Sequence, residues 1–238
     1  MKETNPGGGN LKRLENYYEG EVVDAYESRR ERNPSWHAEN RAFEQFLNQI
    51  ALPRGARVLD APIGTGRFLK SFSDRGFLVI GRDISADMVE SAKSRAAATG
   101  IEGADISIGD ATAIELGDAS VDLVVSVRFL VHLEFATVEK ALREFARVTS
   151  KFVITHIRVA TPGAGNAMKR GLNSWFRKLR GRSGSRRVKI ENKAATMHER
   201  ASIDRLFAEC NLRLLSEVTT AENGKGYTSR MFLLEKAS

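Results

Sequence analysis

VLDAPIGTGRFL, at residues 58–69, places a short apolar run before two closely spaced glycines and the start of a helical pattern. This order predicts a buried strand, a tight turn and the first turn of a helix. Gly64 and Gly66 let the backbone approach a ligand where a Cβ would collide. Unpaired N–H groups and the positive dipole end of the following helix favour an anionic or carboxylate-bearing ligand here. A nucleotide-like cofactor fits this description.

Two acids follow the next predicted strands. The apolar run FLVIGRDI, residues 77–84, stops at Asp83, and ADISIGD, residues 104–110, ends in Asp110 before Ala111. Doubly wound sheets bind ligands outside the carboxyl ends of their strands, where a carboxylate can accept hydrogen bonds from both ribose hydroxyls. We therefore predict that Asp83 binds a ribose and that Asp110 lies near an adenine ring in the same crevice.

Strand and helix patterns alternate along the chain, which predicts an α/β protein with a mostly parallel sheet. Ser85 is expected to cap one helix, and Gly76 and Gly100 to end two. The segments 212–218 and 229–236 are joined by a short loop containing glycine, which predicts an antiparallel hairpin. The other predicted elements are strand 57–61, helix 66–75, strand 77–82, helix 86–99, strands 105–109 and 121–127, helix 136–149, strand 151–157 and helix 200–210.

These motifs resemble the class I S-adenosylmethionine-dependent methyltransferases over about residues 55 to 160. The resemblance implies a doubly wound, mostly parallel seven-stranded sheet with an antiparallel C-terminal strand. It also implies that the glycine turn holds the methionine part of S-adenosylmethionine, that Asp83 holds the ribose and that Asp110 meets the adenine amine. Ile84 and Met88 are expected to pack on the adenine. The full cofactor-binding set is then Asp60, Ala61, Gly64, Gly66, Asp83, Ile84, Met88, Asp110, Ala111 and Val127.

The glycine turn departs from the family pattern at two positions. Pro62 stands where the family usually has glycine, and Ile63 where it has a small residue or cysteine. Proline removes one backbone donor and fixes φ, which bears on the geometry of the turn. A dinucleotide-binding domain is the rival interpretation, but it would require a third glycine where Leu69 stands. In a third interpretation, the glycines only connect a strand to a helix.

Methyl transfer mainly requires the protein to align the acceptor with the methyl group and to exclude water. A general base becomes useful only when the acceptor must lose a proton. His132, just after the fourth predicted strand, is the first candidate for this base, and His156 is a second. Arg128 is a candidate for orienting an anionic acceptor, and Trp175 for contacting the substrate. No metal site is predicted, and the single cysteine, Cys210, excludes an intramolecular disulfide.

Positive charge is concentrated in one segment. Residues 161–193 carry ten basic residues and one acid, a net +9, which leaves −2 for the rest of a chain whose formal charge is +7. Apolar residues, Trp175 among them, recur at helical spacing within it. This is the pattern of a basic amphipathic helix, and residues 165–190 are a candidate for contact with an anionic membrane surface. The alternatives are a lid over the acceptor pocket and, less favoured, contact with RNA.

We expect a flexible tail at residues 1–10 and one methyltransferase domain at residues 11–238. Within the domain, residues 11–54 form a helical leader over the cofactor site, and residues 161–193 an insertion or lid. No membrane span or signal sequence is recognised, so a cytoplasmic protein is expected, with peripheral membrane contact through the basic segment. The predicted function is methyl transfer to a small or lipid-linked acceptor, with O-methylation favoured. The alternatives are an RNA methyltransferase and a methyltransferase-like binding module without turnover.

Overall fold

A computed structural model describes residues 31–161, 196–224 and 226–237 of the chain. Its centre is a seven-stranded sheet in the order β3-β2-β1-β4-β5-β7-β6, as predicted for the fold class. Only β7 runs antiparallel to its neighbours, β5 and β6. The strands are β1 (Arg57–Asp60), β2 (Leu78–Asp83), β3 (Asp105–Ile108), β4 (Val121–Ser126), β5 (Thr149–Ala160), β6 (Leu212–Asn223) and β7 (Tyr227–Lys236).

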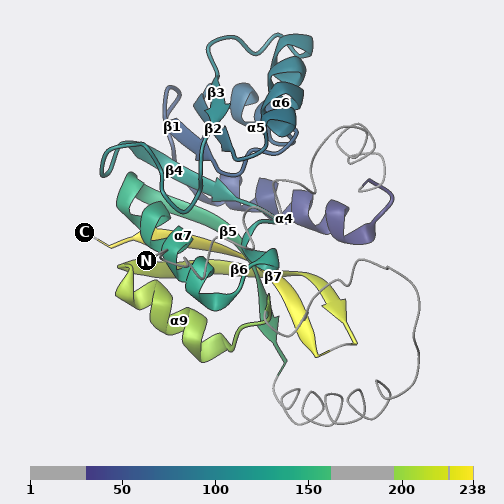
Figure 1. Ribbon diagram of the computed structural model, residues 1–238, viewed down its shortest axis with the longest axis vertical. Coiled ribbons are helices and arrows are strands. Elements are labelled where there is room, and N and C mark those ends of the chain that lie inside the picture. Colours follow the sequence, from purple (N-terminus) through teal and green to yellow (C-terminus); the bar gives the residue numbers. More distant parts are fainter. Residues whose placement is uncertain (1–30, 162–195, 225, 238) are drawn as a thin grey trace, which may run out of the picture.

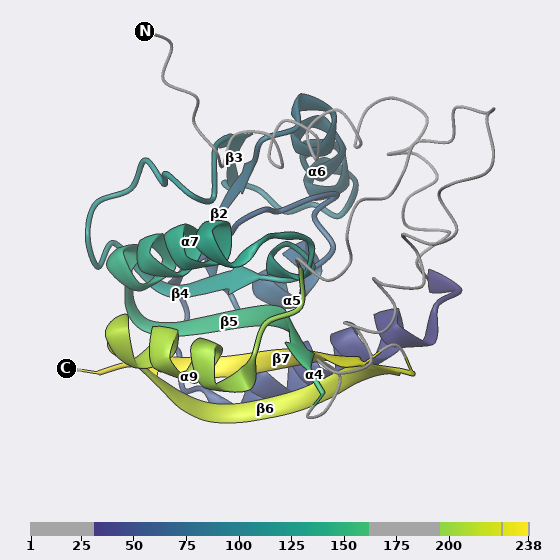
Figure 2. The same ribbon diagram turned by 60° about the horizontal axis from the view of Figure 1, so that its bottom comes forward.

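Helices cover both faces of this sheet (Figures 1 and 2). Alternate strand residues point to opposite faces, so neighbours such as Val58 and Leu59 enter two different apolar cores. The face of Val58 packs against α4, α5 and α6, and the face of Leu59 against α7 and α9. The described helices are α4 (Pro34–Gln49), α5 (Leu69–Asp74), α6 (Ala86–Ala98), the 3-10 helix η1 (Leu130–His132), α7 (Phe135–Val148) and α9 (Arg200–Glu209).

The predicted helix boundaries hold at several positions. Ser85 accepts a hydrogen bond from the Met88 amide at 3.3 Å and so caps α6. Gly76 and Gly100 follow α5 and α6 with φ of 68° and 66°, a conformation that glycine adopts without steric cost. Cys210, which follows α9, is buried, with an exposed fraction of 8%.

Several predicted boundaries were wrong, among them those of β5, which is Thr149–Ala160 and not 151–157. Helix α5 begins at Leu69 and not at residue 66, because two separate turns come first. In the first turn the Gly66 N–H donates to the Ile63 carbonyl, and in the second the Leu69 N–H donates to the Gly66 carbonyl. The terminal hairpin is longer than predicted. Its ladder runs from the Leu212–Lys236 pair to the Asn223–Tyr227 pair, through polar residues whose sequence carries no strand signal.

Part of the sequence interpretation lies outside the described residues. This applies to the tail, to the leader before residue 31, to Trp175 and to the basic segment beyond Thr161. In the parts of the chain that the structure describes, no helix is long and apolar enough to cross a membrane.

Candidate active site

The predicted cofactor residues lie at the carboxyl ends of four neighbouring strands. Asp60 ends β1 and Asp83 ends β2, while Asp110 follows β3 and Val127 follows β4. Parallel neighbours bring these ends to one edge of the sheet, with Leu59 opposite Ile80 and Val124. The fold therefore brings these strand ends to one edge of the sheet, where we expect the cofactor crevice.

The glycine turn lines this crevice with backbone. Gly64 has φ of 55°, and a Cβ built on it would meet no atom within 4 Å, so a ligand has room to approach. Gly66 has φ of 76°, and a Cβ there would lie 2.5 Å from Leu69 Cδ1. Gly64 thus leaves space for a ligand, whereas Gly66 is required by the packing of the turn on α5.

Asp83 connects the glycine turn to α6. Its Oδ2 accepts the Gly64 N–H at 2.9 Å, and its Oδ1 accepts the Ser85 N–H at 3.0 Å. Burial raises the pKa of Asp83, and the Ser85 and Gly64 donors only partly oppose this rise. Each oxygen keeps a lone pair, so a carboxylate fixed in this way can accept further hydrogen bonds from a ligand.

Asp60 is 2% exposed, and its Oδ2 has no hydrogen-bond partner among the described residues. Burial and the neighbouring Asp83 raise the pKa of Asp60 well above its usual range, although Arg67 opposes this. Two adjacent carboxylates, one of them with an unsatisfied oxygen, make the crevice complementary to a cationic group.

The adenine side has a different local structure. Asp110 Oδ1 accepts hydrogen bonds from the backbone N–H and the hydroxyl of Thr112, both at 2.8 Å, so the carboxylate also shapes its own turn. Ala111 and Met88 are buried, with exposed fractions of 6% and 3%, and Ile84 is half-buried. Their contacts with an adenine remain a prediction.

The two departures in the glycine turn are accommodated locally. Ile63 packs over Gly81 of β2, where a Cβ would lie 2.3 Å from Ile63 Cδ1. The Ile63 N–H donates to the Arg82 carbonyl at 2.8 Å. The Ala61–Pro62 peptide is cis. A glycine on the next strand therefore provides the volume that the larger Ile63 side chain needs.

A buried ion cluster that the sequence interpretation missed lies beside this crevice. Glu39 of α4 bridges Arg67, from the glycine turn, at 2.9 Å and Arg128, after β4, at 3.0 Å. The Glu39 side chain is 1% exposed. Burial alone would raise the pKa of Glu39, but Arg128 and Arg67 outweigh it and hold the pKa below its usual value. A signal was available, since Glu39 lies on the apolar stripe of α4 with Phe43 and Phe46.

The two candidate bases differ in environment. His156 is fully buried in β5, with Nε2 3.1 Å from the Thr220 hydroxyl. Burial, reinforced by Arg128 and opposed by Glu39, lowers the pKa of His156 to about 3, so the imidazole is neutral near pH 7. His132 is half-buried in η1. It follows β4 in the chain, and its role as a base stays a prediction.

The lowered pKa of His156 predicts a pH-dependent stability. The unfolded chain takes up a proton near pH 6.5, whereas folded His156 does so only near 3, so its contribution is present above pH 6.5 and is lost as the pH falls. Between pH 6.5 and 5 the free energy of unfolding should fall by about 1.4 kcal/mol per pH unit from this group. Urea unfolding at pH 7, 6 and 5 measures this slope. If the free energy of unfolding depended on pH in the same way in His156→Gln, the lowered pKa of His156 would be contradicted.

Comparisons with known proteins agree with this geometry. Residues 58–151 match the family model of a methyltransferase domain. An uncharacterized methyltransferase, YcgJ of Bacillus subtilis, is 38% identical over 92 residues, which cover 39% of this chain and 36% of that protein. The chain thus spans about a third of the length of this curated relative.

Solved structures extend the likeness to nearly the whole fold. Magnesium protoporphyrin IX methyltransferase from Synechocystis, crystallised with SAH, matches with a TM-score of 0.69 at 16% identity, over 96% of this chain and 100% of that one. A geranyl diphosphate methyltransferase in complex with GPP and sinefungin has a TM-score of 0.62 at 14% identity, over 82% and 77% of the two chains.

The strand order, the single reversed strand and the acids at the strand ends define a class I methyltransferase fold. Residues 58–151 match methyltransferase domains in sequence, and the described fold as a whole is that of the class I S-adenosylmethionine-dependent methyltransferases.

Proposed function

We propose that this protein uses S-adenosylmethionine to methylate a small or lipid-linked acceptor, with oxygen favoured as the methylated atom. The observation that carries the proposal is the crevice in which Asp60, Asp83 and the open backbone at Gly64 meet. The two relatives crystallised with SAH or with sinefungin act on a porphyrin and on geranyl diphosphate by their names, which supports a small-molecule acceptor.

The residues present fit this cofactor. Asp60, which ends β1 just before the glycine turn, has an unsatisfied buried oxygen, which suits the ammonium of a methionine moiety. In this proposal Asp83 offers lone pairs to two ribose hydroxyls, and Asp110 accepts a hydrogen bond from the adenine amine. When bound, the cofactor supplies an activated methyl group together with its own leaving group. The protein then has to orient the acceptor and exclude water, and His132 is the proposed base if the acceptor must lose a proton.

Binding calorimetry with S-adenosylhomocysteine tests the cofactor assignment. Asp83→Ala should weaken binding at least tenfold, because a hydrogen bond to a charged group contributes about 1.5 to 3 kcal/mol. Asp83→Asn should weaken it less, since it keeps one acceptor oxygen.

Asp204→Ala is the matched control for this experiment. It removes a half-exposed acid that pairs with Arg200 at 2.7 Å on α9, across the sheet from α4. Its affinity should equal that of the unaltered protein. The proposal is contradicted if the unaltered protein does not bind S-adenosylhomocysteine, or if Asp83→Ala binds it equally well while remaining folded.

RNA is the second candidate acceptor, favoured by the net +9 of residues 161–193. The same charge supports our proposal of peripheral contact between residues 165–190 and an anionic membrane, because each basic residue near such a surface contributes about 1 kcal/mol. Liposome flotation of the full chain and of a 165–190 deletion, beside an RNA shift assay at two salt concentrations, separates these partners. A binding module without turnover would bind the cofactor and methylate none of them.

A further inference from the structure

Three arginines lie around His156 on the α4 face of the sheet. Arg67, Arg128 and Arg158 each act electrostatically on this imidazole and lower its pKa, whereas the carboxylate of Glu39 raises it. Because His156 is neutral near pH 7, the group of four charged side chains carries an excess of positive charge. Burial, reinforced by Arg128 and opposed by Tyr227, lowers the pKa of Arg158, whose guanidinium lies over the Tyr227 ring at 5.3 Å.

The three guanidinium groups use their donors unequally. Arg67 is fully engaged, with Nε on Asn40, Nη1 on Glu39 and Nη2 on the Trp36 carbonyl, at 2.8 to 2.9 Å. It also stacks over the Trp36 ring at 4.7 Å. Its role is therefore to join the glycine turn to α4.

Arg128 and Arg158 each have an N–H donor that bonds to none of the described residues. Arg128 donates Nη1 to Glu39 at 3.0 Å, and Arg158 donates Nη1 to the Thr196 hydroxyl at 3.0 Å. The Nε of each is buried without a hydrogen-bond partner in the described part of the chain. A guanidinium cannot shed its proton, so buried donors of this kind call for an acceptor.

The backbone at Arg128 gives an independent reason to look for a ligand. Its φ is 68°, in the left-handed region that glycine adopts without steric cost and most other residues avoid. Strained residues of this kind gather at binding sites, where surrounding contacts hold them in place. Here the backbone directs the arginine toward Glu39 and the end of β5.

We propose that Arg128 and Arg158 bind an anionic oxygen group, a carboxylate or a phosphate, on the methyl acceptor. Arg128 follows β4, the neighbour of β1, and Arg158 lies on β5 beyond the last β4–β5 pair, Ser126–Thr155, so both lie at the sheet edge where the cofactor is proposed to bind. The planar fork of arginine matches both anions through paired hydrogen bonds. The acceptor would thus be held by its charged group, away from the atom that receives the methyl. This assignment rests on the proposed function.

Nuclear magnetic resonance of the arginine Nε–Hε groups, recorded on the full chain with S-adenosylhomocysteine bound, tests the assignment. The probes are octanoate and inorganic phosphate, with octanamide as the uncharged analogue. We expect the Arg128 and Arg158 signals to shift in a saturable manner with at least one anion and to be unmoved by octanamide. A response to octanoate alone identifies a carboxylate acceptor, and a response to phosphate alone a phosphorylated one.

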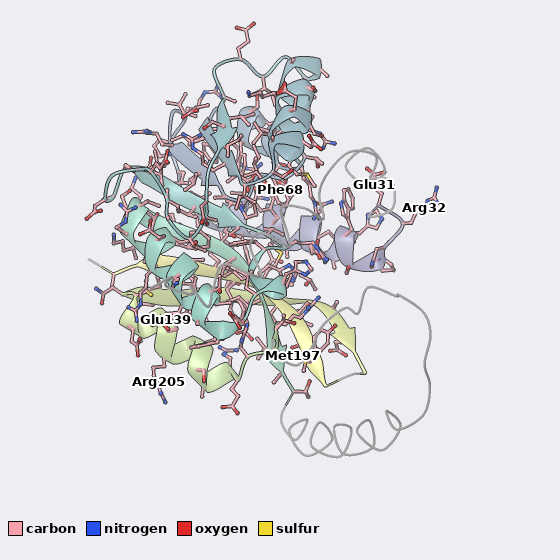
Figure 3. The ribbon with its side chains drawn as sticks, in the orientation of Figure 1. Glu31, Arg32, Phe68, Glu139, Met197 and Arg205 are labelled. Atoms are coloured by element: carbon pink, nitrogen blue, oxygen red, sulfur yellow. The ribbon has the colours of Figure 1, made fainter. Side chains whose placement is uncertain are left out.

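Variants show whether the effect is local. Arg158→Met should weaken anion binding at least fivefold, and Arg158→Lys should recover part of the loss because it keeps the charge without the fork. Arg205→Met is the matched control, because the Arg205 side chain is exposed and points outward from α9 (Figure 3). Equal weakening in Arg205→Met, or no saturable shift at Arg128 and Arg158, would overturn the assignment. Failure to bind S-adenosylhomocysteine would instead contradict the proposed function, so the two failures are distinguishable.

Discussion

Replacing Glu39 by alanine should lower the free energy of unfolding by about 3 kcal/mol or more, because removing one partner of a buried ion pair leaves uncompensated charge. Glu39 is 1% exposed at its side chain and faces both Arg67 and Arg128. Without it, two buried guanidinium groups repel each other beside the glycine turn. Affinity for S-adenosylhomocysteine should also fall, since Arg67 immediately follows Gly66. Urea unfolding and calorimetry measure the two effects.

Glu44 of the same helix is the matched control. It pairs with Arg75 at 3.0 Å, but its side chain is 43% exposed. Exposed ion pairs contribute about 0.2 to 1 kcal/mol, so Glu44→Ala should cost much less than Glu39→Ala. Glu39→Gln keeps a hydrogen-bonding oxygen, so its loss in the free energy of unfolding should lie between those of Glu39→Ala and Glu44→Ala. Equal losses in Glu39→Ala and Glu44→Ala would show that the buried cluster has no special role.

Asp60→Asn should have opposite effects on stability and on cofactor binding. The pKa of Asp60 is raised in the folded protein by burial and by Asp83, so the ligand-free protein loses stability as the pH rises through that value. A neutral amide avoids this cost, and the variant should gain stability relative to the unaltered protein as the pH rises above the usual aspartate pKa of about 4. Affinity for S-adenosylhomocysteine should fall at least tenfold, because a charge-assisted hydrogen bond of about 1.5 to 3 kcal/mol is lost.

Thermal unfolding at several pH values and calorimetry at pH 7.5 check this pair of effects. Asp122→Asn provides the reverse case. Burial alone would raise the pKa of Asp122, but Lys151 and the Arg57 amide hold it below its usual value. Asp122→Asn should therefore destabilise the protein at neutral pH. If Asp60→Asn lowered the stability at every pH, the carboxylate would be structural and its proposed role toward the cofactor would be wrong.

The order of the elements and the acids at the strand ends could be predicted from the sequence because both depend on local pattern. Buried parallel strands are apolar runs, and the run VLD ends where the ligand side of the sheet begins. Asp83 and Asp110 stand out because a charge ends each run. Ser85 and Gly76 mark helix ends through hydrogen bonds and φ values that involve only near neighbours.

The pairing of Glu39 with Arg128 could not be predicted in this way, because 89 positions separate the two residues and only the packing of α4 on the sheet joins them. The burial of His156 likewise depends on β6, which brings Thr220 to within 3.1 Å. Local sequence thus determined where β1, β2 and β3 end and which acids lie there. The tertiary structure decided which of those groups are buried, paired or left with free donors, since burial and charge depend on segments distant in the chain.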